Sequence, residues 1–248
     1  MKKSLKKILF TILTAFAVFF VVACGNKEDT KINKEEVLQK NVEATNNIKS
    51  GNKLVTAKVE IEGGQTIEYI FDISLIKDPF ALKTILGAKG EDAKITTFIK
   101  DGMMYVTSTE DDTWEQQAIP EETIEGYKNI LNDSIEIYEV LKDNLDKISI
   151  KEDGGNYIIS AAKNSDFLNE YLKSSLSDTI GQNTDLKPNN ATLEYIIDKE
   201  TYFTKSLVLT FDAEVQGQKL KAKTETTFSN INSVGEITVP EEALNSNN

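Results

Sequence analysis

Alternation of apolar and polar residues along several segments constrains the fold of this chain most strongly. In residues 53–62 every second residue is apolar, and the same alternation returns in residues 65–75 after Gly63 and Gly64. Side chains of a β-strand point alternately to the two faces of a sheet, so this period of two indicates strands with one buried face. Two glycines between such strands are typical of a tight turn. The segment therefore predicts an antiparallel hairpin.

Shorter segments of the same kind follow along the chain, and most are joined by short turns rich in Asp and Gly. The further strands that we expect cover residues 80–86, 94–100, 103–107, 114–119, 147–152, 156–161, 191–198, 203–216 and 219–228. Consecutive strands joined by short turns pair antiparallel, and a sheet of about eleven strands does not stay flat. The sequence therefore predicts an α+β fold with a strongly curved antiparallel sheet.

Three segments have the spacing of amphipathic helices and cover residues 33–50, 120–146 and 165–180. In the first, Asn33 is the predicted N-cap, Glu36 completes a capping box and Gly51 is the expected stop. The second is expected to divide near residues 132–134, and Ser165 is the expected cap of the third. Each helix has one apolar stripe to bury, so we expect the helices to pack on the concave face of the sheet.

The composition excludes several classes of function. The chain has 28 basic residues, all of them lysine, against 40 acidic residues, with no histidine and a net charge of −12. Lysines scattered among an excess of acids do not form the basic surface that nucleic-acid binding needs. Without histidine and with one cysteine, Ser-His-Asp and Cys-His nucleophiles and His/Cys zinc sites are excluded. We therefore expect no enzyme, no cofactor and no metal site.

The N-terminus has the features of a secretion signal. Lysines within residues 2–7 precede an apolar run over residues 8–23, which ends at Ala23 directly before Cys24. This junction resembles the lipobox of bacterial lipoproteins, which implies cleavage between Ala23 and Cys24 and a diacylglycerol anchor on Cys24. The alternative is an uncleaved membrane anchor, but the run of 16 residues is shorter than the ~20 that a spanning helix needs.

These features divide the chain into four parts. We expect a signal peptide over residues 1–23, a lipidated flexible tether over 24–32, one domain over 33–244 and a disordered tail over 245–248. The anchored domain is expected to lie on the extracellular face of the cell membrane as a monomer. The abundance of Lys, Asn and Ile is typical of low-GC Gram-positive bacteria.

The order of the elements resembles the half-barrel of the LolA and LolB lipoprotein carriers and of the mycobacterial lipoproteins LppX and LprG. The chain is more similar still to lipoproteins of low-GC Gram-positive bacteria in that superfamily. Besides the lipobox, the resemblance rests on the segments MMYV…W (103–114), YIIDKETYF (195–203) and ITVPEEA (237–243). It implies helices packed into a half-barrel that holds a hydrophobic or amphiphilic ligand without catalysis. The chain lacks the arginine that LolA-type carriers use, so their release mechanism is not implied.

The candidate ligand site is the apolar face of the long strands. Its predicted lining consists of Ile67, Tyr69, Phe71, Ile73, Leu207, Leu209 and Phe211. These side chains either line a cavity for a hydrophobic ligand or pack against the helices as core, and the sequence does not separate the two cases. With a filled core and no ligand, the protein would instead be a cell-envelope interaction or structural lipoprotein.

Two further patterns in the sequence have residue types that occur in metal sites or catalytic sites. The acid clusters at residues 110–112 and 121–122 lack the spacing of an EF-hand loop, and we interpret them as solvated loop acids. Ser-x-x-Lys spacings occur at residues 50/53, 74/77 and 160/163, without the companion motifs of Ser-Lys enzymes. We interpret these as chance spacings in a lysine-rich chain and assign no catalytic residue.

Overall fold

The computed structural model describes residues 32–109, 113–163, 165–180, 187–215 and 217–246. The chain divides into two units, residues 1–31 and 32–248, and the description below concerns the second. The predicted signal peptide, Cys24 and the tether up to residue 31 lie outside the described residues. No helix in the described part is long and apolar enough to cross a membrane.

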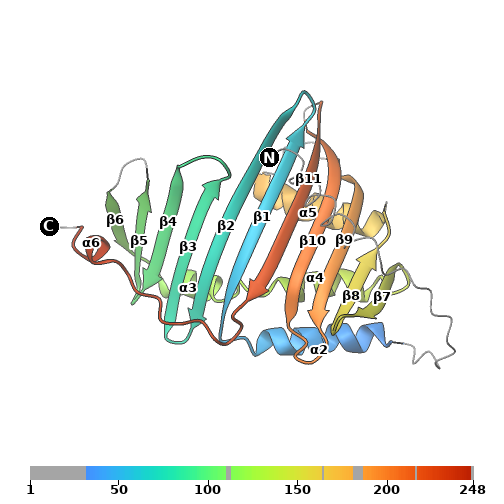
Figure 1. The fold of residues 1–248 in the computed structure, drawn as a ribbon, viewed down its shortest axis with the longest axis horizontal. Coiled ribbons are helices and arrows are strands. Elements are labelled where there is room, and N and C mark those ends of the chain that lie inside the picture. The colour runs from blue at the N-terminus through green and yellow to red at the C-terminus, as the bar shows by residue number, and fades with distance from the viewer. Residues whose placement is uncertain (1–31, 110–112, 164, 181–186, 216, 247–248) are drawn as a thin grey trace, which may run out of the picture. The chain divides into compact units, whose positions relative to one another are not determined.

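Eleven strands form one antiparallel sheet in the order β6-β5-β4-β3-β2-β1-β11-β10-β9-β8-β7 (Figure 1). The strands are β1 (Ser50–Ile61), β2 (Gln65–Lys77), β3 (Phe80–Ala88), β4 (Lys94–Lys100), β5 (Met103–Ser108), β6 (Trp114–Ala118), β7 (Ile148–Asp153), β8 (Asn156–Ala161), β9 (Asn189–Asp198), β10 (Thr204–Val215) and β11 (Gln218–Ser229). Two meanders are thus joined where the first strand pairs with the last. The sheet is not closed, because β6 and β7 remain as edges. The predicted α+β half-barrel of about eleven strands is confirmed.

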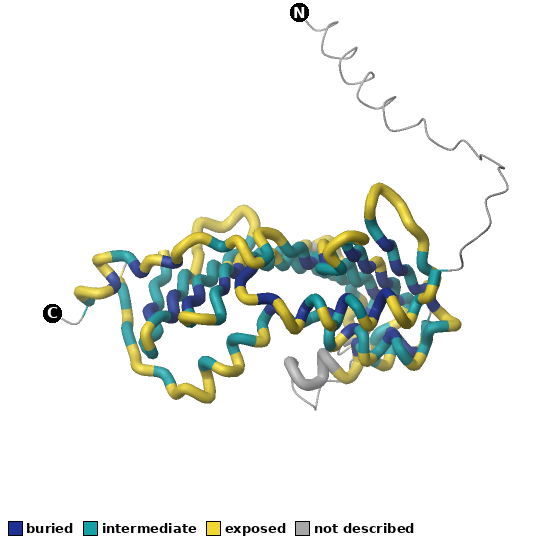
Figure 2. The backbone as a smooth tube through the Cα atoms, turned by 90° about the horizontal axis from the view of Figure 1, so that it is seen from below, coloured by how far each residue is buried: buried dark blue, intermediate teal, exposed yellow. Residues whose placement is uncertain are grey.

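Helices α2 (Lys34–Asn46), α3 (Glu121–Tyr127), α4 (Asp133–Lys142) and α5 (Asp166–Ile180) lie on one side of the sheet, which we call its concave face (Figure 2). Of these, α2, α4 and α5 bury side chains, whereas α3 has no buried residue. Asn33 caps α2 as predicted, since its side chain accepts a hydrogen bond from the backbone of Glu36 at 3.3 Å. The division of the 120–146 segment into α3 and α4 is confirmed as well. The helices leave their polar sides to solvent, as a single apolar stripe requires.

The predicted stop of the first helix is wrong. Helix α2 ends at Asn46 with Asn47 as its C-cap, and Gly51 is the second residue of β1. A Cβ atom at Gly51 would lie 3.0 Å from Cδ1 of both Leu131 and Ile231. The glycine therefore allows these two side chains to approach the sheet closely, which is a packing role rather than a helix-terminating one.

The helices bury two separate apolar clusters on the concave face. The first core lies on β7 to β10 under α2, α4 and α5, and its centre includes Leu38, Leu141, Ile159, Leu168 and Ile197. The second core lies on β2 to β4 under the link between α3 and α4, and consists of Ile48, Ile73, Leu75, Leu82, Ile99 and Leu131. Neither core includes the concave side chains of β1 or those of β2 to β4 at Ile67, Tyr69, Leu86 and Ile95.

The C-terminal segment packs on the opposite, outer face of the sheet. Ile237, Val239 and Ala243 form a third cluster with Ala81, Phe98 and Tyr105, and the Lys100 ammonium donates to the carbonyl of Ile237 at 3.0 Å. The short helix α6 (Glu241–Leu244) ends this segment, and residues 245–246 continue it as a turn. The ITVPEEA segment (237–243) therefore packs on the outer face of the sheet.

A buried polar network fastens helices to the sheet. The Tyr195 hydroxyl donates to Oδ1 of Asn41 at 2.5 Å and lies 2.9 Å from Oγ1 of Thr204. Asn41 in turn donates to the carbonyl of Tyr202 at 2.8 Å, and Thr45 and Ser134 join α2 to α4 through their hydroxyls at 2.5 Å. Burial raises the pKa of the Tyr195 phenol, so this hydroxyl remains a donor.

Candidate functional site

Six of the seven predicted lining residues meet on the concave face in shared cross-strand rows, whereas Ile73 faces Lys53 on β1. The rows are Leu207–Thr226–Val55–Phe71–Leu86–Ile95, Leu209–Thr224–Ala57–Tyr69–Ala88 and Phe211–Ala222–Val59–Ile67. Each row connects one predicted residue of β10 with one of β2 across β11 and β1. The sequence indicated that both sets of residues are apolar, and the structure places them in register.

Burial divides the seven predicted residues into core and surface. Ile73 is 1% exposed and Phe211 9% exposed, and both belong to the cores. Phe71 packs against the second core, while Leu207 and Leu209 pack against the first. Ile67 and Tyr69 belong to none of the three clusters, and Tyr69 is 47% exposed.

The apolar side chains of β1 to β4 that belong to neither concave core form a continuous half-exposed surface. We call it the open apolar face, and it consists of Val55, Ala57, Val59, Ile67, Tyr69, Leu86 and Ile95. Leu86 and Ile95, which are 40% and 46% exposed, were not predicted as lining residues. The alternation in residues 80–86 and 94–100 would have been the signal for them. Exposed apolar patches of this kind are typical of binding surfaces.

A partly buried ion pair marks one boundary of this face. The Lys53 ammonium lies 2.7 Å from Oδ1 of Asp133 and 3.1 Å from the carbonyl of Ile130, and its side chain is 11% exposed. Lys53 precedes Val55 on the same face of β1, so the pair attaches the link between α3 and α4 directly beside the open apolar face. The Lys77 ammonium reaches the same link at Oδ1 of Asn132, at 3.5 Å, and burial lowers the pKa of Lys77.

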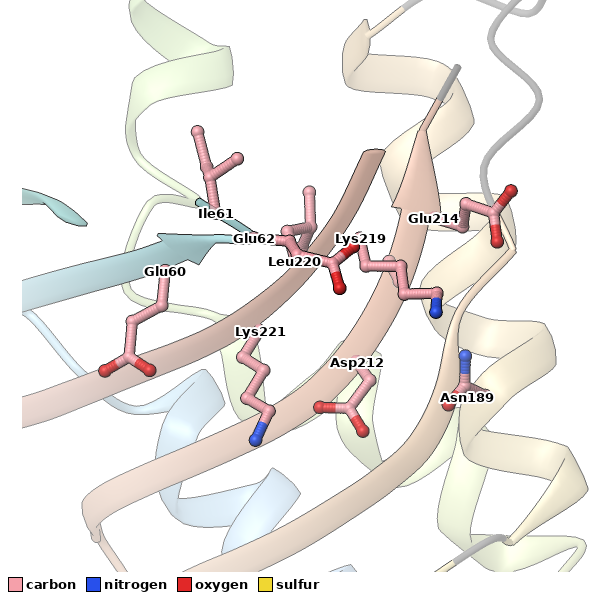
Figure 3. Close-up of a pocket in the computed structure, with 10 residues that line it drawn as sticks. Glu60, Ile61, Glu62, Asn189, Asp212, Glu214, Lys219, Leu220 and Lys221 are labelled. Carbon is pink, nitrogen blue, oxygen red and sulfur yellow. The ribbon is translucent and has the colours of Figure 1, made fainter. Parts of the chain in front are cut away.

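Two adjoining hollows lie over β1 and β9 to β11, and they are lined by charged side chains of the outer face. The first, of about 470 Å³, includes Glu62, Glu214 and Lys219, and the second measures about 450 Å³. Both are bordered by Glu60, Asp212 and Lys221. Figure 3 shows Ile61 and Leu220 pointing away from those three side chains. Of the predicted lining residues, Phe211 borders the second hollow.

The described residues do not arrange the Ser-x-x-Lys spacings or the acid clusters as a catalytic or metal site. Lys53 and Lys77, from two of the Ser-x-x-Lys spacings, are engaged with the α3–α4 link as described above. Glu121 and Glu122 are exposed in the first turn of α3, and the acids at 110–112 lie outside the described residues. Within the described part of the chain, no group of three or more acidic or cysteine side chains is placed to hold a metal ion.

Three solved structures are similar to this chain. The Mycobacterium tuberculosis lipoprotein LppX matches with 11% identity and a TM-score of 0.43, over 83% of this chain and 100% of that chain. A DUF1329 family protein from Desulfovibrio piger matches with 10% identity and a TM-score of 0.28, over 82% and 94%. A LolA superfamily protein from Nitrosomonas europaea matches with 6% identity and a TM-score of 0.25, over 85% and 96%.

No relative was found among curated protein sequences. A family model does match, over residues 33–248, which is nearly the whole of the predicted mature domain. This chain therefore belongs to the family of unknown function DUF6612.

Proposed function

We propose that this protein is a lipoprotein, anchored through Cys24 to the extracellular face of the cell membrane, that binds a hydrophobic or amphiphilic ligand on its open apolar face. The observation that carries the proposal is the position of this face, which adjoins both concave cores but belongs to neither and is left partly exposed. A chain without histidine and with one cysteine supports a binding role rather than a catalytic one.

Covering the open apolar face is energetically favourable. Tyr69, Leu86 and Ile95 are each 40–47% exposed. Complete burial of a large apolar side chain contributes about 1.5–3 kcal/mol, so covering the exposed part of these three contributes about 2–4 kcal/mol. The three rows extend ~14 Å along the strands, close to the ~15 Å of one bilayer leaflet's hydrocarbon. An acyl chain therefore matches the face in length and in polarity.

The rival function is a cell-envelope interaction lipoprotein without a small ligand. The openness of the same face favours it, since a half-exposed apolar patch also suits a protein partner. The two candidates differ in what remains bound when the protein is purified alone.

Native mass spectrometry of residues 26–248 tests the ligand proposal, because this fragment contains the whole compact unit that begins at residue 32. We expect an additional lipid-sized mass that organic extraction removes and that a long-chain fatty acid restores. Leu86→Gln should weaken this binding about tenfold or more, because it removes apolar contact and places an amide against the ligand. Leu54→Gln is the matched control, since Leu54 is also 40% exposed but lies on the outer face of β1. If neither host lipid nor added fatty acid binds, the interaction function replaces this proposal.

The anchor has a separate test. Cys24→Ala should leave the membrane fraction or remain unprocessed, because the thiol that carries the diacylglycerol is lost. Fractionation and mass spectrometry of the N-terminus measure both results. An unchanged mature lipoprotein would contradict the proposed anchor.

A further inference from the structure

The outer face carries a local excess of lysines that is independent of the apolar face. The second hollow, of about 450 Å³, is bordered by Lys58, Lys163, Lys221 and Lys223 but by two carboxylates, Glu60 and Asp212. We call this hollow the lysine trough. The whole chain has a net charge of −12, whereas the lining of this hollow has more lysines than acidic residues.

Both carboxylates of the trough already have partners. Glu60 lies 2.5 Å from the Lys58 ammonium, and Asp212 accepts a hydrogen bond from Nδ2 of Asn190 at 2.7 Å. Lys221 on β11 faces Glu60 on β1 and Asp212 on β10, so it is flanked by acids of both neighbouring strands. Among the described residues, Lys163 forms no ion pair, and its ammonium group is therefore available to an external anion.

The register of the sheet brings like charges together in the trough. Lys58 on β1 faces Lys223 on β11, and like charges in facing positions of a sheet are destabilising. Each of these lysines pairs with a glutamate of its own strand, but the side chains are 42–49% exposed, so these pairs contribute little. An anion placed between the two lysines would relieve their repulsion.

Hydroxyl groups continue the same row. Thr210 faces Lys223 on one side and Thr192 on the other, and the two threonine hydroxyls lie 2.5 Å apart. One hydroxyl donates to the other, which leaves the second hydroxyl hydrogen for another acceptor. The row thus offers ammonium and hydroxyl donors side by side.

We propose that the lysine trough binds a phosphate group. Lysine ammonium groups are typical phosphate ligands. The four ammonium groups and the threonine hydroxyl provide more hydrogen-bond donors than a single carboxylate ligand could accept, so they suit a phosphate better. The adjoining hollow has the opposite balance, with Glu60, Glu62, Asp212 and Glu214 against Lys219 and Lys221 (Figure 3). This acidic end confines an anion to the lysine trough. The phosphate comes either from a free phosphorylated polyol or from a phospholipid headgroup.

Two binding experiments on residues 26–248 at low ionic strength distinguish these sources. Isothermal titration with glycerol 3-phosphate, with glycerol as the uncharged control, measures the free ligand. Flotation with phosphatidylglycerol vesicles, with phosphatidylcholine vesicles as the control, measures the headgroup. Binding in either experiment, lost on changing the trough, supports the proposal.

The test variant is Lys58→Gln with Lys223→Gln, and it should weaken binding at least about fivefold. The control is Lys142→Gln with Lys199→Gln, which removes the same charge from two lysines that also pair with glutamates but lie outside the trough. Thermal melting should show no loss of stability in the test variant, because neutralising the facing lysines removes repulsion. Equal weakening by both variants, or no binding of either phosphate probe, would overturn the proposal. Retention of a hydrophobic ligand should not change in either variant.

Discussion

Removal of the Tyr195 hydroxyl should destabilise the protein far more than removal of an exposed one. Tyr195 is 1% exposed and Asn41 is fully buried. In Tyr195→Phe, Oδ1 of Asn41 loses the donor that now lies 2.5 Å away, and the ring still fills its space. A buried acceptor without a donor costs about 1–3 kcal/mol, and the lost contact with Thr204 adds to that cost. We expect the free energy of unfolding to fall by about 2–3 kcal/mol.

Urea unfolding of residues 26–248, followed by circular dichroism, measures this difference. For a domain of this size, a loss of 2–3 kcal/mol lowers Tm by about 5–10 °C. Tyr69→Phe is the control, because the Tyr69 side chain is 47% exposed and its hydroxyl reaches water. If the free energies of unfolding of the two variants differ by less than about 0.5 kcal/mol, the hydrogen bond from Tyr195 to Asn41 does not stabilise the attachment of α2 to the sheet.

Three further changes test other contacts by stability. Hydrogen bonds from Lys205 and from the backbone of Thr201 hold the pKa of Asp198 well below its usual range. A carboxyl whose folded pKa is depressed stabilises the fold above its unfolded pKa of about 4 and loses that effect as pH falls, so Asp198→Asn should cost about 1–2 kcal/mol at pH 7. The melting temperatures of the wild-type protein and of Asp198→Asn should approach each other as the pH falls toward 2. A difference that stays constant with pH would show that the stabilisation does not come from the ionised carboxylate. Lys53→Met leaves Asp133 without its ammonium partner and should cost about 2–3 kcal/mol, with faster hydrogen exchange in residues 121–132; unchanged exchange there would show that the pair does not hold the link. Gly51→Val should cost about 1–3 kcal/mol in urea unfolding, because its Cβ would lie 3.0 Å from Leu131 and Ile231; Gly51→Ala should cost less.

The strands could be predicted from the sequence because their signal is local. A period of two depends on which residue follows which, and the observed bounds of the predicted strands differ from the expected ones by three residues or fewer. Gly51 shows where this reasoning stops. A glycine after a helical pattern predicts the end of a helix. In the structure Gly51 instead lies in β1 and leaves room for the side chains of Leu131 and Ile231, which are distant in sequence.

The candidate site was harder to predict because burial is a tertiary property. Tyr69 and Ile73 occupy equivalent alternating positions of β2, yet one is 47% and the other 1% exposed. The difference arises because the link between α3 and α4 covers Ile73 and leaves Tyr69 open. Leu86 and Ile95 were missed for a related reason: the alternation in their strands indicates the face on which they lie, but it does not indicate that the helices leave this part of the face uncovered.

The pairing of the first strand with the last also sets the order in which the site can form. β1 is made early during synthesis, and its partner β11 follows only after about 160 further residues. Contacts that are so distant in sequence form late, because a long loop must close first. Every apolar row crosses this junction between β1 and β11. A chain that lacks its last strand therefore has the two outer parts of each row but no continuous surface, so the proposed ligand would bind only to the completed protein.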